Sequence, residues 1–168
     1  MKTLRWLTFG LFGIVLSCGG GTIEFGDVVS IPAGNAAGNG YTATYTVRVT
    51  ITSAGCANVA ALDVPVVGKV SQVDVVVTQE DGALTLASLD SVTLRGGIQI
   101  DSRFEVGGAA VVTVEGADNI LRMVHLNGNF TDATSFKGTG EERMTGRIST
   151  QDVDCTFSFS VDALQKPA

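Results

Sequence analysis

Residues 92–106 read VTLRGGIQIDSRFEV, and this stretch decides the fold class of the 168-residue chain. Apolar and polar side chains alternate along it, which is the period of a β-strand with one buried face. The alternation places on one face Val92, Leu94, Ile98, Ile100 and Phe104, and on the other Thr93, Arg95, Gln99, Asp101, Arg103 and Glu105. We therefore expect strands with one dry face and one wet face.

The same period runs through most of the chain. It recurs at Tyr45, Val47, Val49 and Ile51, at Val73, Val75 and Val77, at Leu84 and Leu86, at Val112 and Val114, at Leu126 and Phe130, and at Phe157, Phe159 and Val161. Turn-forming residues separate these runs at 80–82, 106–108, 117–119 and 132–134. No long helical period intervenes, so hairpin connections and antiparallel pairing are expected. The Ala-rich segment 53–65 is compatible with a short helix or another strand.

Eight to ten short strands with one apolar face predict an all-β, antiparallel up-and-down barrel, with a two-sheet β-sandwich as the alternative. Gly96, Gly128, Gly138 and Gly146 lie inside strands and predict bulges or sharp coiling, which a barrel needs. A transmembrane barrel carries aromatic girdles at both interfaces, whereas the aromatic residues Trp and Tyr after the leader are limited to Tyr41 and Tyr45. We therefore expect the apolar face to point inward.

The N-terminal residues are typical of an export leader. Lys2 and Arg5 precede an apolar run from Trp6 to Leu16, which is too short for the ~20 residues of a transmembrane helix. The residues Val15-Leu16-Ser17-Cys18 resemble the lipobox of bacterial lipoproteins. This resemblance implies cleavage after Ser17 and acylation of Cys18, and it covers the leader alone. An ordinary secretory leader with a chance cysteine is the alternative.

The resemblance implies a signal peptide at 1–17 and an acylated Cys18 with a Gly-rich tether at 18–22. The length and strand period of the remainder predict a single β-barrel domain at 23–168. In such lipoproteins an aspartate directly after the cysteine marks inner-membrane retention. Position 19 is glycine, so the implied location is the outer membrane of a bacterial cell envelope. In topology, the expected barrel resembles the small barrels of the lipocalin and avidin type.

Two cysteines remain once Cys18 is assigned to lipid, namely Cys56 and Cys155. An exported domain with two cysteines favours one disulfide, and two free buried thiols are the alternative. We expect Cys56 just past a strand that ends near Thr52, and Cys155 at the start of the strand that ends near Val161. Antiparallel pairing of these strands would join the first strand to the last, as closure of a barrel requires.

The charge balance argues against two classes of partner. Of the 11 basic residues, Lys2 and Arg5 lie in the leader, so 9 remain against 17 acidic residues, a net charge of −8. An acidic domain of this kind is not expected to bind nucleic acid or to lie on acidic head groups through a basic patch.

No residue pattern indicates an enzyme, a metal site or a cofactor. His125 is the single histidine, and we expect it on the polar face with Met123, Asn127 and Asn129, opposite Val124, Leu126 and Phe130. The pair Asp152 and Asp154 supplies too few oxygens for calcium. Glu141-Glu142 before Arg143 is typical of a solvated turn, and no phosphate-binding glycine motif is present.

Two functions remain from the sequence. The favoured one is a structural or protein-interaction role in the envelope, through the outer face or the Gly-rich loop at 35–40. The alternative is a carrier of a small apolar ligand in the barrel interior, with Phe130, Phe136, Phe157 and Phe159 as candidate contacts. A carrier requires an apolar pocket of about 300 Å³ or more between the sheet walls.

Overall fold

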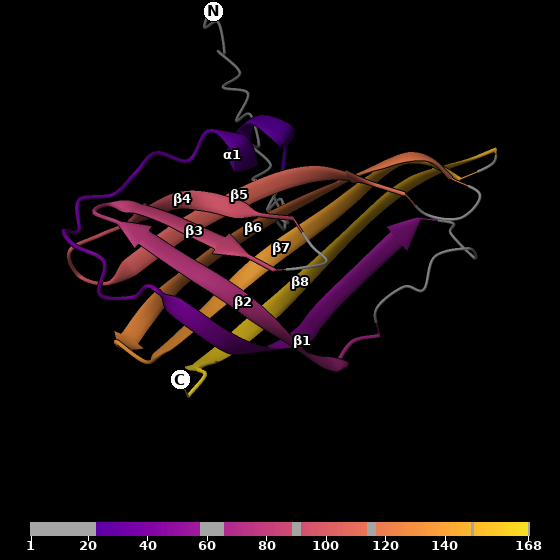
Figure 1. The fold of residues 1–168 in the computed structure, drawn as a ribbon. Helices are drawn as coiled ribbons and strands as arrows, with labels where there is room; N and C mark the ends of the chain where they lie inside the picture. Colours follow the sequence, from indigo (N-terminus) through magenta and orange to yellow (C-terminus); the bar gives the residue numbers. More distant parts are fainter. Residues whose placement is uncertain (1–22, 58–65, 89–91, 114–116, 149, 168) are drawn as a thin grey trace, which may run out of the picture.

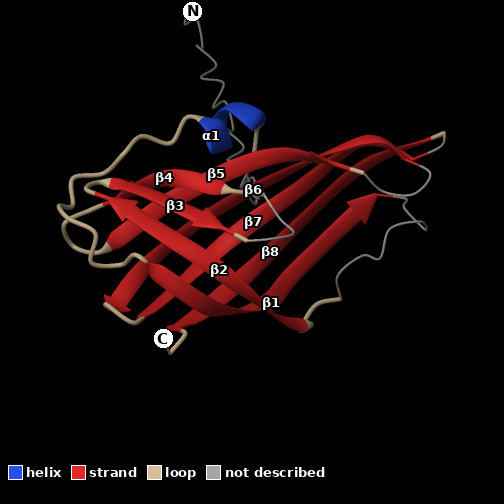
Figure 2. Cartoon of the chain, viewed as in Figure 1, coloured by secondary structure: helices blue, strands red, loops and turns tan. Residues whose placement is uncertain are grey.

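The computed structural model describes residues 23–57, 66–88, 92–113, 117–148 and 150–167. The leader, Cys18 and the tether at 18–22 lie outside these residues, as do Val114 and most of the segment 53–65. In Figure 2, the described part of the chain consists mainly of strands. The elements are α1 (Phe25–Val29), β1 (Ala43–Ala57), β2 (Val70–Glu80), β3 (Ala83–Ala87), β4 (Leu94–Ile98), β5 (Arg103–Val112), β6 (Ala117–Asp132), β7 (Ser135–Ile148) and β8 (Gln151–Gln165).

The eight strands form one ring-like sheet. Each strand pairs antiparallel with the next, and β8 pairs back with β1 (Figure 1). The up-and-down, barrel-like arrangement predicted from the period of two is confirmed, and the two-sheet sandwich is not adopted. The ring is uneven, because β3 and β4 have five residues each whereas β1, β6, β7 and β8 have 14 to 16.

The predicted disulfide is present between Cys56 and Cys155, which face each other across β1 and β8. The strand boundaries predicted around it are wrong. A register shift between Ile51 and Ser53 lets β1 continue to Ala57 instead of ending near Thr52. Cys155 lies inside β8, which begins four residues earlier at Gln151. Residues 53–57 are therefore strand.

The apolar face points into the ring, as predicted, with one exception in the stretch 92–106. Ile98 and Phe104 are buried, but the side chain of Ile100 is 82% exposed. β4 ends at Ile98, and residues 99–102 form the turn into β5, closed by a hydrogen bond from the Ser102 amide to the Gln99 carbonyl. The alternation fails at Ile100 because a turn does not keep the strand period.

Gly128 and Gly140 make room for aromatic rings, and neither lies at a register shift. A Cβ at Gly128 would lie 2.3 Å from the Phe104 ring, and a Cβ at Gly140 would lie 2.5 Å from the Phe159 ring. The register shifts occur elsewhere, between Ile51 and Ser53, between Asp118 and Leu121, and between Phe130 and Asp132. Of the bulges or sharp coiling predicted at Gly96, Gly128, Gly138 and Gly146, the bulges at the first three are therefore wrong, whereas Gly146 lies opposite the shift between Asp118 and Leu121.

The sequence analysis did not predict α1, which lies outside the ring against β5 and β6 (Figure 1). Ile23 and Val28 pack there on Met123, with Ala109 and Leu121 at the margin. The outward face of β6 is therefore apolar where α1 covers it and polar beyond it, at His125 and Asn127.

Candidate functional site

Aromatic side chains fill one end of the barrel. Phe130 lies at their centre, with its ring centroid 4.0 Å from that of Tyr41 and 5.2 Å from that of Phe136. Tyr45 and Phe104 complete the group, which we call the aromatic end. The Tyr45 hydroxyl donates a hydrogen bond to the Ala133 carbonyl at 3.0 Å. Burial raises the pKa of Tyr45, and nearby Tyr41 and Asp132 add to the shift, so its hydroxyl stays protonated as a donor.

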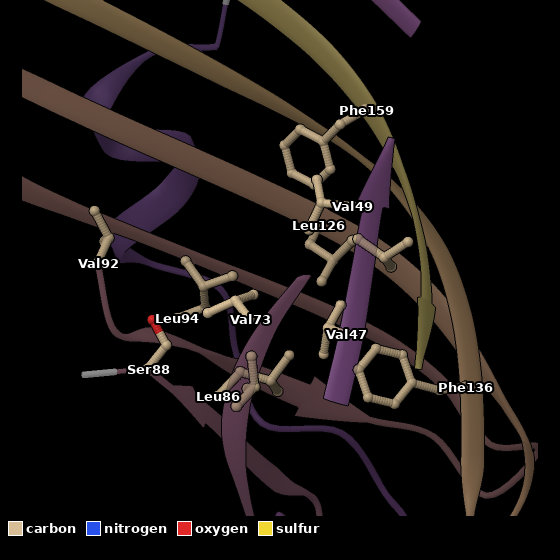
Figure 3. A pocket seen from close by; sticks show the side chains of 12 residues that line it. Val47, Val49, Val73, Leu86, Ser88, Val92, Leu94, Leu126, Phe136 and Phe159 are labelled. Carbon is tan, nitrogen blue, oxygen red and sulfur yellow. The ribbon is translucent and has the colours of Figure 1, made fainter. Parts of the chain in front are cut away.

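A small apolar cavity of about 100 Å³ lies next to the aromatic end, between the sheet walls. The rings of Phe136 and Phe159 line it from two separate places, with Val47, Val49 and Leu126 between them (Figure 3). Ser88 is the one polar residue of its lining, which consists of Val47, Val49, Val73, Val75, Leu86, Ser88, Val92, Leu94, Leu126, Phe136, Phe159 and Val161. An apolar cavity of about 150 Å³ accepts a molecule the size of benzene. This cavity therefore has room for one aliphatic side chain or a short alkyl segment.

The cavity borders a strand edge that lacks a partner among the described residues. β2 pairs with β1 over Val70–Val77, but its pairing with β3 begins only at Val76. We call the segment Val70–Val75 the β2 edge. Its backbone on the side away from β1 faces the gap beside Val73 and Val75, both of which line the cavity.

Exposed valines surround the β2 edge. Val70, Val73 and Val76 are 44%, 37% and 51% exposed, and Val66 and Val67 in the preceding turn are more exposed still. Asp74 accepts a 2.6 Å hydrogen bond from Lys166, and this contact together with Thr46 lowers the pKa of Asp74. An unpaired strand edge with apolar side chains is a surface to which other chains add.

Three of the four phenylalanines proposed as ligand contacts lie in one core cluster, and two of these three line the cavity. Phe136 and Phe159 line the cavity, whereas Phe130 lies within the aromatic end. Phe157 belongs to a separate cluster near the disulfide, with Ile120, Ile148, Val153 and Cys155.

The chain matches no protein-family model, no curated protein and no solved structure.

The sequence analysis missed the β2 edge, although the sequence held a signal for it. The run Val75-Val76-Val77 breaks the alternation, so one valine has to point outward. Val76 is that residue. What the pattern could not show is that β3 would be too short to cover the first half of β2.

The polar candidates form pairs on both faces of the sheet. His125 and Asp154 lie on the outward face, whereas Glu142 lies beside the inward-facing Val124 and is 17% exposed. Glu142 is inside β7, so the solvated turn predicted there is wrong. His125 lies on the predicted face, with its Nε2 2.9 Å from Glu105 Oε1. Glu142 binds the Arg122 guanidinium through both oxygens, at 2.7 and 2.8 Å. Asp154 accepts two hydrogen bonds from Arg143, which lower the pKa of that carboxyl.

The described part of the chain contains no group of three or more histidine, cysteine, aspartate or glutamate side chains placed to hold a metal ion. Nor do the described residues include a helix long and apolar enough to cross a membrane.

Proposed function

We propose that this protein is a lipid-anchored bacterial envelope lipoprotein, acylated at Cys18 and held at the outer membrane, whose domain is a non-enzymatic protein-interaction module. The partner is an extended segment of another envelope protein that pairs with the β2 edge. The observation that carries the interaction is the segment Val70–Val75, which on its side away from β1 pairs with no strand among the described residues and lies beside an open apolar cavity.

Strand addition explains the chemistry of the β2 edge. A peptide that adds to a sheet gains main-chain hydrogen bonds along the edge, and side-chain pockets supply its specificity. Here the backbone of β2 provides the first feature and the cavity lined by Val73 and Val75 provides the second. Every second residue of an added strand points to the same side. The favoured partner sequence therefore carries a valine, leucine or isoleucine at the position that faces the cavity.

A carrier of a small apolar ligand is the second candidate, because the cavity lining is apolar apart from Ser88. The volume of about 100 Å³ favours the interaction module. Drug-sized ligands occupy pockets of about 300 Å³ or more.

The anchor rests on the lipobox resemblance at 15–18 and is tested by Cys18→Ser. Two or three acyl chains bind a membrane firmly, whereas a single chain binds only marginally. We expect the variant to move from the membrane to the soluble fraction. Continued membrane retention of Cys18→Ser contradicts acylation as the anchor.

The interaction is tested by photo-crosslinking in the native envelope, with a photoreactive phenylalanine at position 73. We expect a discrete protein adduct. Mass spectrometry should identify the crosslinked peptide as a segment rich in aliphatic residues. A second measurement uses Val73→Arg, which places a charge at the cavity. We expect it to weaken co-purification of that partner at least about tenfold, since a buried charge without a partner is costly.

Val111→Arg is the matched control, because Val111 is an exposed valine on β5, away from the β2 edge. Circular dichroism has to show that both variants fold. Equal loss of the partner in the two variants contradicts the β2 edge as the docking site. A small-molecule adduct at position 73 in place of a protein adduct favours the carrier.

A further inference from the structure

The outside helix α1 fixes where the N-terminal end of the described chain leaves the barrel. Val28 is 1% exposed and Ile23 is 7% exposed, both against the outward face of β5 and β6. Arg143 on β7 donates a hydrogen bond to the Ile23 carbonyl at 3.2 Å and pairs with Glu24 at 3.1 Å. The same guanidinium is held by Asp154 on β8. Residue 23 is therefore attached to the wall of the barrel.

The same helix leaves two large apolar side chains uncovered. Phe25 and Val29 are 52% and 51% exposed. They are four residues apart, so they are neighbours on the helix surface. Single exposed apolar residues are ordinary on a protein surface. A phenylalanine and a valine on one helical turn, next to the predicted anchor, form an apolar contact face, which we call the α1 face.

The length of the chain sets how far this face lies from an acylated Cys18. Four residues lie between Cys18 and Ile23, so five Cα–Cα steps join them, and a fully extended chain of that length spans at most about 18 Å. The head-group layer on one side of a bilayer is about 5 to 8 Å thick. A barrel anchored through Cys18 is therefore held close to the membrane surface, with α1 as its nearest element.

We propose that the α1 face rests on the lipid bilayer, with Phe25 and Val29 inserted among the head groups, so that the acyl anchor and the helix together hold the barrel in one orientation. This inference rests on the acylation of Cys18 in the proposed function. The surface that the α1 face contacts is the lipid bilayer. The attraction is apolar and not electrostatic, because Asp27 in the helix and Glu24 before it are both acidic. Acidic lipids are therefore not required.

The orientation has a consequence for the β2 edge. The helix α1 lies against β5 and β6, which are three and four strands from β2 in the ring of eight and therefore lie on the far side of the barrel from β2. With the α1 face on the membrane, the β2 edge points away from it. The edge is then accessible to a partner that is not embedded in the same leaflet.

The test uses the acylated chain reconstituted in phosphatidylcholine vesicles, with a spin label at position 29 or at position 76. Val76→Cys is the matched control for Val29→Cys, because both are valines that are 51% exposed, and Val76 lies on β2. Collisions with oxygen report lipid, and collisions with a water-soluble nickel chelate report solvent. We expect the oxygen-to-nickel ratio at position 29 to exceed that at position 76 at least about threefold.

A second variant tests the role of Phe25. Phe25→Ser in the background of the label at position 29 should lower the ratio toward the value at position 76, whereas Val111→Ser should leave it unchanged. Phe25 is half exposed, so its replacement does not remove a core residue.

The outcomes separate this inference from the proposed function. Flotation of the chain with the vesicles, together with mass spectrometry of the acylated Cys18, tests the anchor by itself. A chain that floats but carries both labels in water, or carries only the label at position 76 in lipid, overturns the orientation and leaves the anchor intact. A chain that is not acylated or does not float overturns the anchor, and the orientation with it.

Discussion

The two ends of the barrel are held by different means although the same alternation encodes both. At the aromatic end, ring contacts cross the lumen between strands that are not neighbours: Tyr45 on β1 contacts Phe136 on β7, and Phe104 on β5 also contacts Phe136. At the other end, which we call the disulfide end, Cys56 and Cys155 join β1 and β8, which are already paired. Contacts across the lumen fix the shape of the ring, whereas the disulfide stabilises only the pairing of β1 with β8.

The largest effect is expected from Phe136→Ala, because Phe136 is 1% exposed and contacts three other rings. Removal of a buried phenylalanine costs about 3 to 5 kcal/mol of the free energy of unfolding. Chemical denaturation measures the loss, and Phe136→Leu should cost markedly less. A loss below about 1 kcal/mol would show that the lumen contacts do not hold the aromatic end.

A smaller effect is expected from the double change Cys56→Ser with Cys155→Ser, since it leaves the ladder between β1 and β8 in place. Removal of a disulfide typically costs about 2 to 4 kcal/mol. Hydrogen exchange should quicken at the disulfide end, near residues 53–57 and 153–157, before it quickens at Tyr45 and Phe130. Uniform quickening across both ends contradicts a local role for the bond.

Tyr45→Phe should cost about 1 kcal/mol, the contribution of a typical hydrogen bond. The change keeps the ring contacts with Phe130 and Phe136 and removes the hydroxyl that donates to the Ala133 carbonyl. Thermal unfolding of this variant beside Phe136→Ala separates the ring contacts from the hydrogen bond. A cost equal to that of Phe136→Ala would mean that the hydroxyl is the main determinant of the aromatic end.

The smallest effect is a pH dependence at the disulfide end. The hydrogen bonds from Arg143 lower the pKa of Asp154 in the folded state, so this carboxyl stabilises the fold above its unfolded pKa of about 3.9. That stability is lost as the pH falls through the lowered folded pKa. Asp154→Asn should therefore be less stable than the parent at pH 7, and the difference should disappear in strong acid. A difference that persists at pH 2 contradicts this linkage, and carboxyl NMR titration reports the pKa directly.

The sequence was sufficient to predict the antiparallel ring of strands, but it did not predict the helix α1 or the cavity. The period of two gave the antiparallel strands, and two cysteines near the ends of the domain gave the pairing of β1 with β8. Ile100 was placed wrongly because a turn interrupted the period, and the end of β1 was placed wrongly because a register shift carried it past Thr52. Both errors are local changes of backbone that a periodic pattern does not record.

The helix α1 and the cavity depend on contacts between distant residues. Met123 on the outward face of β6 was a signal that something covers that face, but only the fold shows that Ile23 and Val28 do so. The period predicted that Phe130, Phe136, Phe157 and Phe159 point inward. Which of them meet depends on strand stagger, and this placed Phe136 and Phe159 at the cavity and the others elsewhere.

The bond between Cys56 and Cys155 also determines how the molecule would respond to a pull on its two ends. The bond spans 99 residues of sequence, including all of β2 to β7. A force applied at residue 23 and residue 167 passes through the two sulfurs and bypasses that loop. Only the segments outside the cysteines can then be drawn out, and about 340 Å of extended chain stays hidden from the force until the bond is reduced. In a single-molecule stretching experiment, the disulfide therefore sets how far the chain can extend, and the pairing of the strands sets the force at which it unfolds.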